Sequence, residues 1–164
     1  MKKIVLLLLL TITFSGCEKD DICTDETTPR LVLEFYDISN PANLKNVLNV
    51  KVTGEGQTAL GIFSGVSKIE LPIDITQDTT KFSLILNSTS LSSANEDMLQ
   101  FNYARQNVFV SRACGYKTIF EFNATPNGVI KTDATNPDGI WIQDINILTT
   151  NIETENETHI NIYF

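Results

Sequence analysis

Apolar and polar residues alternate with a period of two along most of the chain from Arg30 onward. Side chains of a β-strand point to opposite faces in turn, so this pattern predicts half-buried strands. No long segment has the 3.6-residue stripe of an amphipathic helix. The clearest alternating sets are Leu31/Leu33/Phe35, Leu48/Val50/Val52, Ile69/Leu71/Ile73/Ile75, Phe82/Leu84/Leu86, Leu99/Phe101/Tyr103 and Thr118/Phe120/Phe122.

Turn-forming residues separate these runs. We expect turns at Asn107, at 126–128 and at 136–139, where Pro, Asn and Gly concentrate, and a polar loop over 87–97. Pro72 cannot donate to a ladder, which predicts an edge or bulged strand there. Segments 140–149 and 158–164 suggest a closing hairpin. About eight to ten short strands predict an all-β antiparallel β-sandwich, with a small β-barrel as the alternative.

The N-terminus has the features of a signal peptide. Lys2 and Lys3 precede an apolar stretch that starts at Ile4 and is too short to span a bilayer core of ~30 Å. The run 14–17 (Phe-Ser-Gly-Cys) resembles a bacterial lipobox, which implies removal of residues 1–16 and acylation of Cys17. Two or more acyl chains would hold the protein stably at a membrane. The alternative is an ordinary secreted protein with a chance cysteine near its cleavage site.

Four charged residues follow Cys17: Glu18, Lys19, Asp20 and Asp21. They resemble the surface-export signal of Bacteroidota lipoproteins, which implies an outer-membrane location with the domain facing the cell exterior. The alternative is a solvated, charged tether. We expect residues 17–29 to form a lipidated flexible tether and 30–164 to form a single domain.

Charge narrows the range of partners. Removal of residues 1–16 takes away two of the 12 basic residues and none of the 20 acidic ones, so the mature charge is −10. Such a chain repels phosphate backbones, which argues against nucleic-acid binding.

Besides Cys17, the expected site of acylation, the mature chain contains two cysteines, Cys23 and Cys114. An exported protein meets an oxidising compartment, so a disulfide between them is the first expectation. The alternative is a buried free Cys114 and an exposed Cys23. Two thiols alone are too few for a zinc site, so we expect neither a metal nor a cofactor.

Residues that could support catalysis are scarce. His159 is the only histidine, and its phase relative to Ile160 and Ile162 predicts an exposed side chain. We interpret Glu96–Asp97 and the acids at 153, 155 and 157 as solvated loop charges. Nucleophile-elbow, zinc-protease, P-loop and dinucleotide-binding patterns are absent from the sequence.

Three further features have weak functional interpretations. Segment 133–139 is faintly similar to a calcium loop but lacks the ligand register of an EF-hand, so a plain turn is favoured. Trp141 is expected in the core, although an exposed Trp would bind sugars, and the four tyrosines would support such a surface if they clustered. Asp78-Thr79-Thr80 resembles an O-glycosylation motif of exported Bacteroidota proteins, with Thr79 as the acceptor.

Several motifs together resemble a family of small Bacteroidota lipoproteins of uncharacterised function. They are Thr28-Pro29-Arg30-Leu31 through Phe35-Tyr36-Asp37, then Leu71-Pro72-Ile73, and Tyr103 with Ser111-Arg112-Ala113-Cys114-Gly115-Tyr116. The resemblance implies a neighbouring outer-membrane β-barrel protein as a partner and assigns no catalytic residues.

These observations favour a non-enzymatic accessory subunit that docks on an integral β-barrel protein in assembly, transport or secretion. An exposed sheet edge, such as the one carrying Pro72, would supply the contact. The alternatives are a glycan- or nutrient-binding lipoprotein and, third, a hydrolase built on a carboxylate pair.

Overall fold

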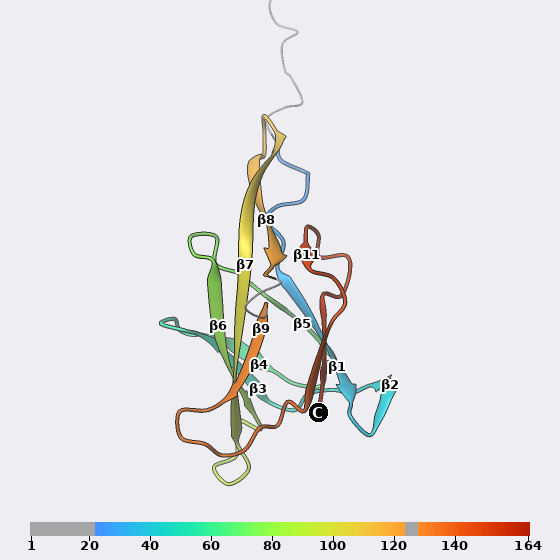
Figure 1. Cartoon of the computed structure of the whole chain (residues 1–164), viewed down its shortest axis with the longest axis vertical. Coiled ribbons are helices and arrows are strands. Elements are labelled where there is room, and N and C mark those ends of the chain that lie inside the picture. Colours follow the sequence, from blue (N-terminus) through green and yellow to red (C-terminus); the bar gives the residue numbers. More distant parts are fainter. Residues whose placement is uncertain (1–21, 124–127) are drawn as a thin grey trace, which may run out of the picture.

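The computed structural model describes residues 22–123 and 128–164, which form two packed β-sheets (Figure 1). The predicted turn at 126–128 lies largely outside these residues. None of the described residues form a helix of the length and apolarity needed to cross a membrane. The strands are β1 (Leu31–Asp37), β2 (Asn40–Leu44), β3 (Val50–Gly54), β4 (Ala59–Phe63), β5 (Lys68–Leu71), β6 (Thr79–Leu86), β7 (Asn95–Ser111), β8 (Gly115–Phe122), β9 (Val129–Asp133), β10 (Asp144–Ile147), β11 (Asn151–Ile152) and β12 (Ile160–Tyr163).

The smaller sheet has five strands arranged around β1. Its order is β10-β12-β1-β2, and β5 also pairs with β1. β1 and β12 run parallel, with Leu33 opposite Ile160, while the other pairs are antiparallel. β5 ends at Leu71, directly before Pro72, and pairs only with β1 among the described strands. The prediction of an edge strand at Pro72 is therefore confirmed.

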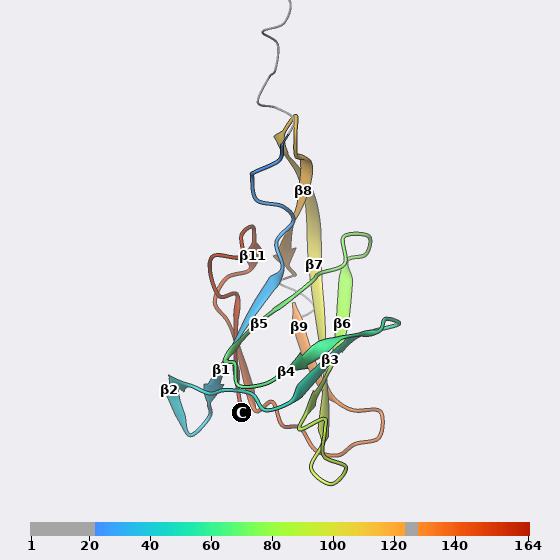
Figure 2. The same ribbon diagram turned by 180° about the vertical axis from the view of Figure 1, so that it is seen from behind.

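The larger sheet has seven strands arranged around the 17-residue β7. The first part of β7 pairs with β6 and β9, and the second part pairs with β8. The β7–β8 hairpin consequently extends past the rest of the sandwich and forms one end of the molecule (Figures 1 and 2). The expected turn at Asn107 is wrong, because Asn107 pairs with Thr118 within this hairpin and the chain reverses at 111–115 instead.

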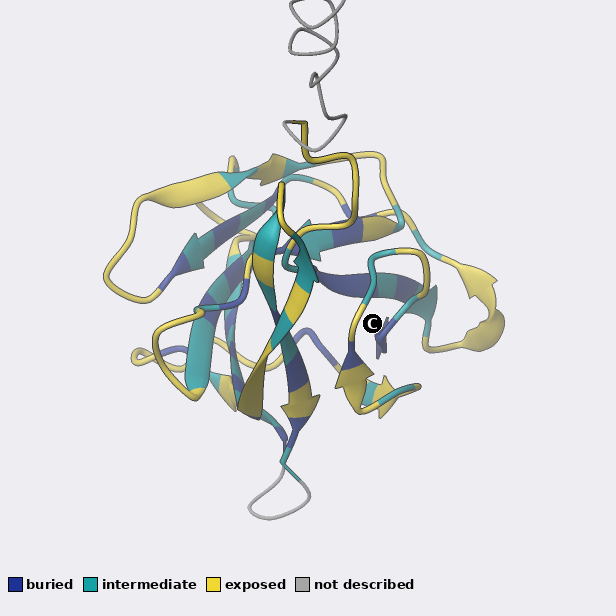
Figure 3. Ribbon diagram, turned by 90° about the horizontal axis from the view of Figure 1, so that it is seen from above, coloured by how far each residue is buried: buried dark blue, intermediate teal, exposed yellow. Residues whose placement is uncertain are grey.

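The core lies between the two sheets and contains most members of the predicted alternating sets (Figure 3). Leu48 and Ile75 are exceptions, since both are exposed. Leu33, Phe35, Leu84 and Phe101 are fully inaccessible to solvent. The sheets do not close on one another, so the β-sandwich is confirmed and the barrel alternative is excluded. Burial of these apolar side chains is the main stabilising contribution.

Candidate functional site

The N-terminal segment is attached covalently to the β7–β8 hairpin. Cys23 and Cys114 form a disulfide, with Cα atoms 4.8 Å apart, which confirms the predicted pairing. The backbone N–H of Thr118 donates to Thr28 Oγ1 (2.9 Å), so the segment also lies along β8. Cys17 and the four charged residues after it lie outside the described residues. The described part of the expected tether is thus held against the domain from Cys23 onward.

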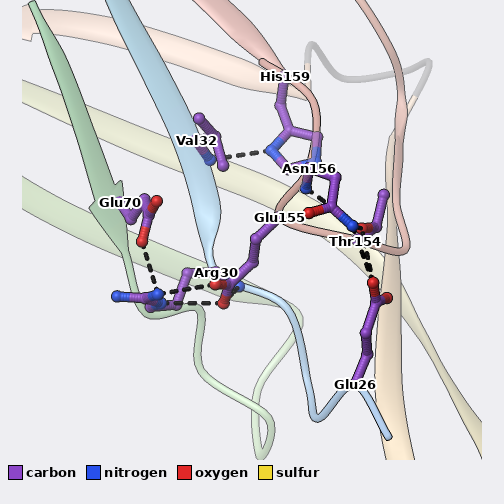
Figure 4. Close-up of polar contacts among 8 residues, drawn as sticks. All are labelled: Glu26, Arg30, Val32, Glu70, Thr154, Glu155, Asn156 and His159. Carbon is purple, nitrogen blue, oxygen red and sulfur yellow. Dashed lines mark hydrogen bonds and ion pairs between the residues drawn. The ribbon is translucent and has the colours of Figure 1, made fainter.

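Arg30 fastens the end of this segment to a loop far away in the sequence (Figure 4). Its Nε and Nη2 atoms donate to the two carboxylate oxygens of Glu155 at 2.9 and 2.7 Å, and its backbone N–H donates to the same carboxylate at 2.8 Å. Arg30 Nη2 also lies 2.6 Å from Glu70 on β5. The hydrogen bond from Arg30 lowers the pKa of Glu155. Glu155 is therefore an anchoring group rather than the solvated loop charge expected from the sequence.

His159 contradicts the expectation of an exposed side chain, because it is completely buried. Its Nδ1 accepts a hydrogen bond from the Val32 N–H (2.9 Å), and the backbone N–H of His159 donates to the Val32 carbonyl (3.1 Å). The ring proton must then sit on Nε2. Burial lowers the pKa of His159, opposed in part by the backbone of Thr154. The imidazole holds the start of β12 against β1 and is out of reach of a substrate (Figure 4).

The buried imidazole makes stability depend on pH. A folded-state pKa below the usual ~6.5 means that the contribution of His159 is present above that value and is lost as the pH falls through the folded pKa. We expect the free energy of unfolding to decrease as the pH is lowered from about 7.5 to about 5. Urea denaturation, monitored by Trp141 fluorescence, measures this change. His159→Gln should be less stable at neutral pH but should show a flatter dependence in this window. Equal pH slopes for the two proteins would contradict the assignment.

Asp97 is a second buried ionisable group, and here too the sequence interpretation is wrong. It lies on β7 rather than in a solvated loop and is fully inaccessible. Its Oδ2 accepts a hydrogen bond from the Ile142 N–H (2.7 Å). Burial raises the pKa of Asp97, partly offset by the N–H groups of Ile142 and Trp141. The carboxyl group thus fixes the irregular segment that carries Trp141 into the core.

Aromatic side chains do not gather into a sugar-binding face. Trp141 is 7% exposed and donates from Nε1 to the Leu84 carbonyl (3.1 Å), which confirms it as a core residue. Tyr103 is buried, Tyr36 packs against Tyr163 with tilted rings, and Tyr116 lies on the distant β7–β8 hairpin. A hollow of about 430 Å³ beside β8 and β11 is lined mainly by polar side chains and contains none of these residues. The glycan-binding alternative loses its motivation.

Segment 133–139, which is faintly similar to a calcium loop, is a turn held by hydrogen bonds to its own Asp133 side chain. Asp133 Oδ1 accepts hydrogen bonds from the N–H groups of Ala134 (2.7 Å) and Asp138 (3.3 Å), and its Oδ2 accepts one from Gly139 (3.1 Å). The carboxylate therefore already serves the backbone of its own loop. Within the part of the chain that the structure describes, no three His, Cys, Asp or Glu side chains are grouped to hold a metal ion.

Thr79, the suggested glycosylation site, is the first residue of β6. Its hydroxyl donates to Asn102 Oδ1 (3.1 Å), and the neighbouring Asp78 is paired with Arg105 Nε at 2.7 Å. A sugar on Thr79 would replace this donated hydrogen, and its attachment stays a prediction.

Two sheet edges differ in a way that matters for recognition. β4 pairs only with β3 among the described strands and carries Leu60 and Ile62, which are 39% and 56% exposed. The other edge, β5, carries the charged residues Lys68 and Glu70 on its outward positions. Charges protect an edge strand against pairing, whereas exposed apolar residues favour it. The sequence pattern did not reveal this contrast, because β4 (Ala-Leu-Gly-Ile-Phe) has no polar residues that alternate with its apolar ones.

A comparison with known families places the chain. Residues 48–164 match the model of DUF6452, a family of unknown function. The chain belongs to the DUF6452 family. This agrees with the expected membership of an uncharacterised family, and the DUF6452 match spans all strands from β3 to β12. No curated protein and no solved structure shows a significant match to the chain.

Proposed function

We propose that this DUF6452 protein is a lipid-anchored outer-membrane lipoprotein that faces the cell exterior and acts as a non-enzymatic accessory subunit of an integral β-barrel protein. The observation that carries the proposal is the Cys23–Cys114 disulfide. If Cys17 is acylated, only six residue steps separate the lipid from this pinned point, or at most ~20 Å of extended chain. The domain would then stay beside the membrane, where its neighbours are integral membrane proteins.

The β4 edge offers a surface for a protein contact. Its unpaired backbone groups can accept an additional strand, and Leu60 and Ile62 supply apolar contacts for alternate side chains. The β5 edge is a weaker candidate, because Glu70 is already paired with Arg30. We therefore assign the docking surface to β4 rather than to the edge next to Pro72.

Purification of the full-length lipidated protein from its membrane in mild detergent tests the docking. We expect one integral membrane protein at stoichiometric levels, and we expect Ile62→Lys to reduce its recovery severalfold because a charge on the edge strand opposes pairing. Leu148→Lys is the matched control, since Leu148 is 51% exposed and lies outside β4. Recovery of no membrane protein would overturn the docking function, and equal loss in both variants would overturn the assignment to β4.

Lipidation needs a separate measurement. Incorporation of labelled fatty acid is expected in the parent and absent in Cys17→Ala. Labelling of both proteins, or of neither, would contradict an anchor at Cys17.

A further inference from the structure

The end of the β7–β8 hairpin carries an exposed aromatic pair. Phe109 and Tyr116 are direct antiparallel partners, with ring centroids 5.4 Å apart at an interplanar angle of 70°. Phe109 is 56% exposed and Tyr116 is 71% exposed, and no other aromatic side chain among the described residues is largely exposed. The other described aromatic side chains are buried or half-buried.

The fold itself does not require this pair. The hairpin extends past the sandwich (Figures 1 and 2). The rings of Phe109 and Tyr116 contact each other, and neither residue belongs to the core between the sheets. Leaving two large aromatic rings in water forgoes the free energy that their burial would provide. Two adjacent exposed rings are suited to contact with another phase or molecule that has an apolar surface.

The position of the pair relative to the lipid anchor identifies that phase. Tyr116 is two residues from Cys114, which is bonded to Cys23. If Cys17 is acylated, as the proposed function requires, Cys23 lies within ~20 Å of the bilayer surface along the chain. The disulfide joins Cys23 directly to the turn of the hairpin, with the two Cα atoms 4.8 Å apart. Arg112 is exposed in the same turn and makes no ion pair with any residue that the structure describes. Lys117, the other nearby cation, is already bound to Glu26 and the Glu153 carbonyl.

We propose that the tip of the β7–β8 hairpin contacts the lipid interface directly, with Phe109 and Tyr116 at the level of the headgroups and Arg112 beside their phosphates. Tyrosine, whose ring has an apolar body and a polar hydroxyl, concentrates at membrane–water interfaces, and a guanidinium group binds phosphate well. The wholly apolar ring of Phe109 adds hydrophobic contact at the same place. This contact is a second attachment besides the acyl chains. It keeps the hairpin end against the lipid, with the opposite end of the molecule directed away from the membrane surface.

Trp fluorescence of the full-length lipidated protein in vesicles tests the contact. Phe109→Trp places a reporter at the tip, and Tyr116→Trp repeats the test on the opposite strand in case the first variant fails to fold. The vesicles are phosphatidylethanolamine and phosphatidylglycerol, with or without brominated acyl chains that quench Trp at short range. The parent contains only the buried Trp141 and supplies the background.

Leu91→Trp is the matched control. Leu91 is fully exposed, in the turn between β6 and β7 at the opposite end of the molecule (Figure 1). We expect a blue shift and severalfold stronger quenching for the tip variants than for Leu91→Trp, whose emission should match that of a Trp in water. Equal quenching of the tip and control variants, while all proteins float with the vesicles, would overturn the lipid contact alone.

Two other outcomes are equally decisive. Failure of every variant to float with the vesicles would overturn the lipid anchor, and with it both the proposed function and this contact. Absence of tip quenching in vesicles, combined with protection of the tip Trp from aqueous iodide in native membranes, would show that the aromatic pair contacts a protein and would also overturn the proposal.

Discussion

Replacement of Cys23 and Cys114 by Ser is expected to lower the free energy of unfolding by between about 2 and 4.6 kcal/mol, the upper figure following from the chain entropy of a 91-residue loop. The fold itself should persist, because neither Cys23 nor Cys114 belongs to a strand of either sheet. Urea denaturation followed by Trp141 fluorescence measures the difference. Reduction of the parent protein should reproduce it, and an unchanged midpoint after verified reduction would contradict it.

Glu26→Gln is the matched control for the disulfide variant. Glu26 Oε1 accepts a hydrogen bond from Asn156 Nδ2 (2.9 Å), and its Oε2 lies 3.7 Å from Lys117 Nζ, so the substitution loosens the same segment without opening the loop. Exposed ion pairs of this kind contribute less than about 1 kcal/mol. A comparable loss of stability in Glu26→Gln would mean that the polar contacts, not the disulfide, hold the N-terminal segment.

Opening the disulfide should also affect attachment to the membrane. The first point at which the N-terminal segment is attached to the domain would move from Cys23 to Thr28 and Arg30. Their contacts are non-covalent and partly exposed, and they join Thr28 to Thr118 and Arg30 to Glu155 and Glu70. The domain could then stand further from the lipid, and the hairpin tip would lose its fixed distance from the acyl chains. Weaker quenching of Phe109→Trp in the disulfide-free background would follow from the same geometry.

The sequence pattern was sufficient to predict strands in which one face meets the core and the other meets water. β3, β6 and β8 follow it, with Val52, Leu84 and Phe120 on their buried faces. β1 departs from it, because Val32, on the face opposite Leu33, is buried as well. It was insufficient for β2, whose five residues are all exposed, and for the two-residue β11. Pairing with a neighbour creates these strands, and backbone hydrogen bonds leave no hydrophobic signature.

The candidate site was predicted in part. The disulfide followed from compartment and cysteine count, whereas the Arg30–Glu155 pair joins residues 125 positions apart and has no local signal. His159 was misjudged because alternation assumes one wet face, whereas both faces are covered here. Ile160, Asn161 and Ile162 are all buried, and the Thr154 backbone lies near the imidazole. The exposed pair Phe109 and Tyr116 emerged only from the register of the hairpin.

Substitution of Asp97 by Ala is expected to cost about 2–3 kcal/mol, because it removes a charge-assisted hydrogen bond and leaves the buried Ile142 N–H without its acceptor. Asp97→Asn should cost less, since an amide oxygen can still accept from that N–H group. Denaturation with Trp141 fluorescence is a suitable measurement, because Trp141 directly precedes Ile142. Retention of parental stability by Asp97→Ala would mean that Asp97 does not fix this segment.

The pH dependence separates the charge of Asp97 from its hydrogen bond. Burial raises its pKa, with a further contribution from Asp133 directly opposite on β9, so the folded state favours the protonated form. That contribution to stability is present below the unfolded pKa of about 3.9 and is lost as the pH rises through the folded value. The stability of Asp97→Asn relative to the parent should therefore increase as the pH is raised from about 4. Asp144→Asn, the same change at an exposed position of β10, should stay within about 0.5 kcal/mol of the parent throughout. A relative stability of Asp97→Asn that falls with rising pH would show that the N–H groups, rather than burial, dominate the ionisation of Asp97.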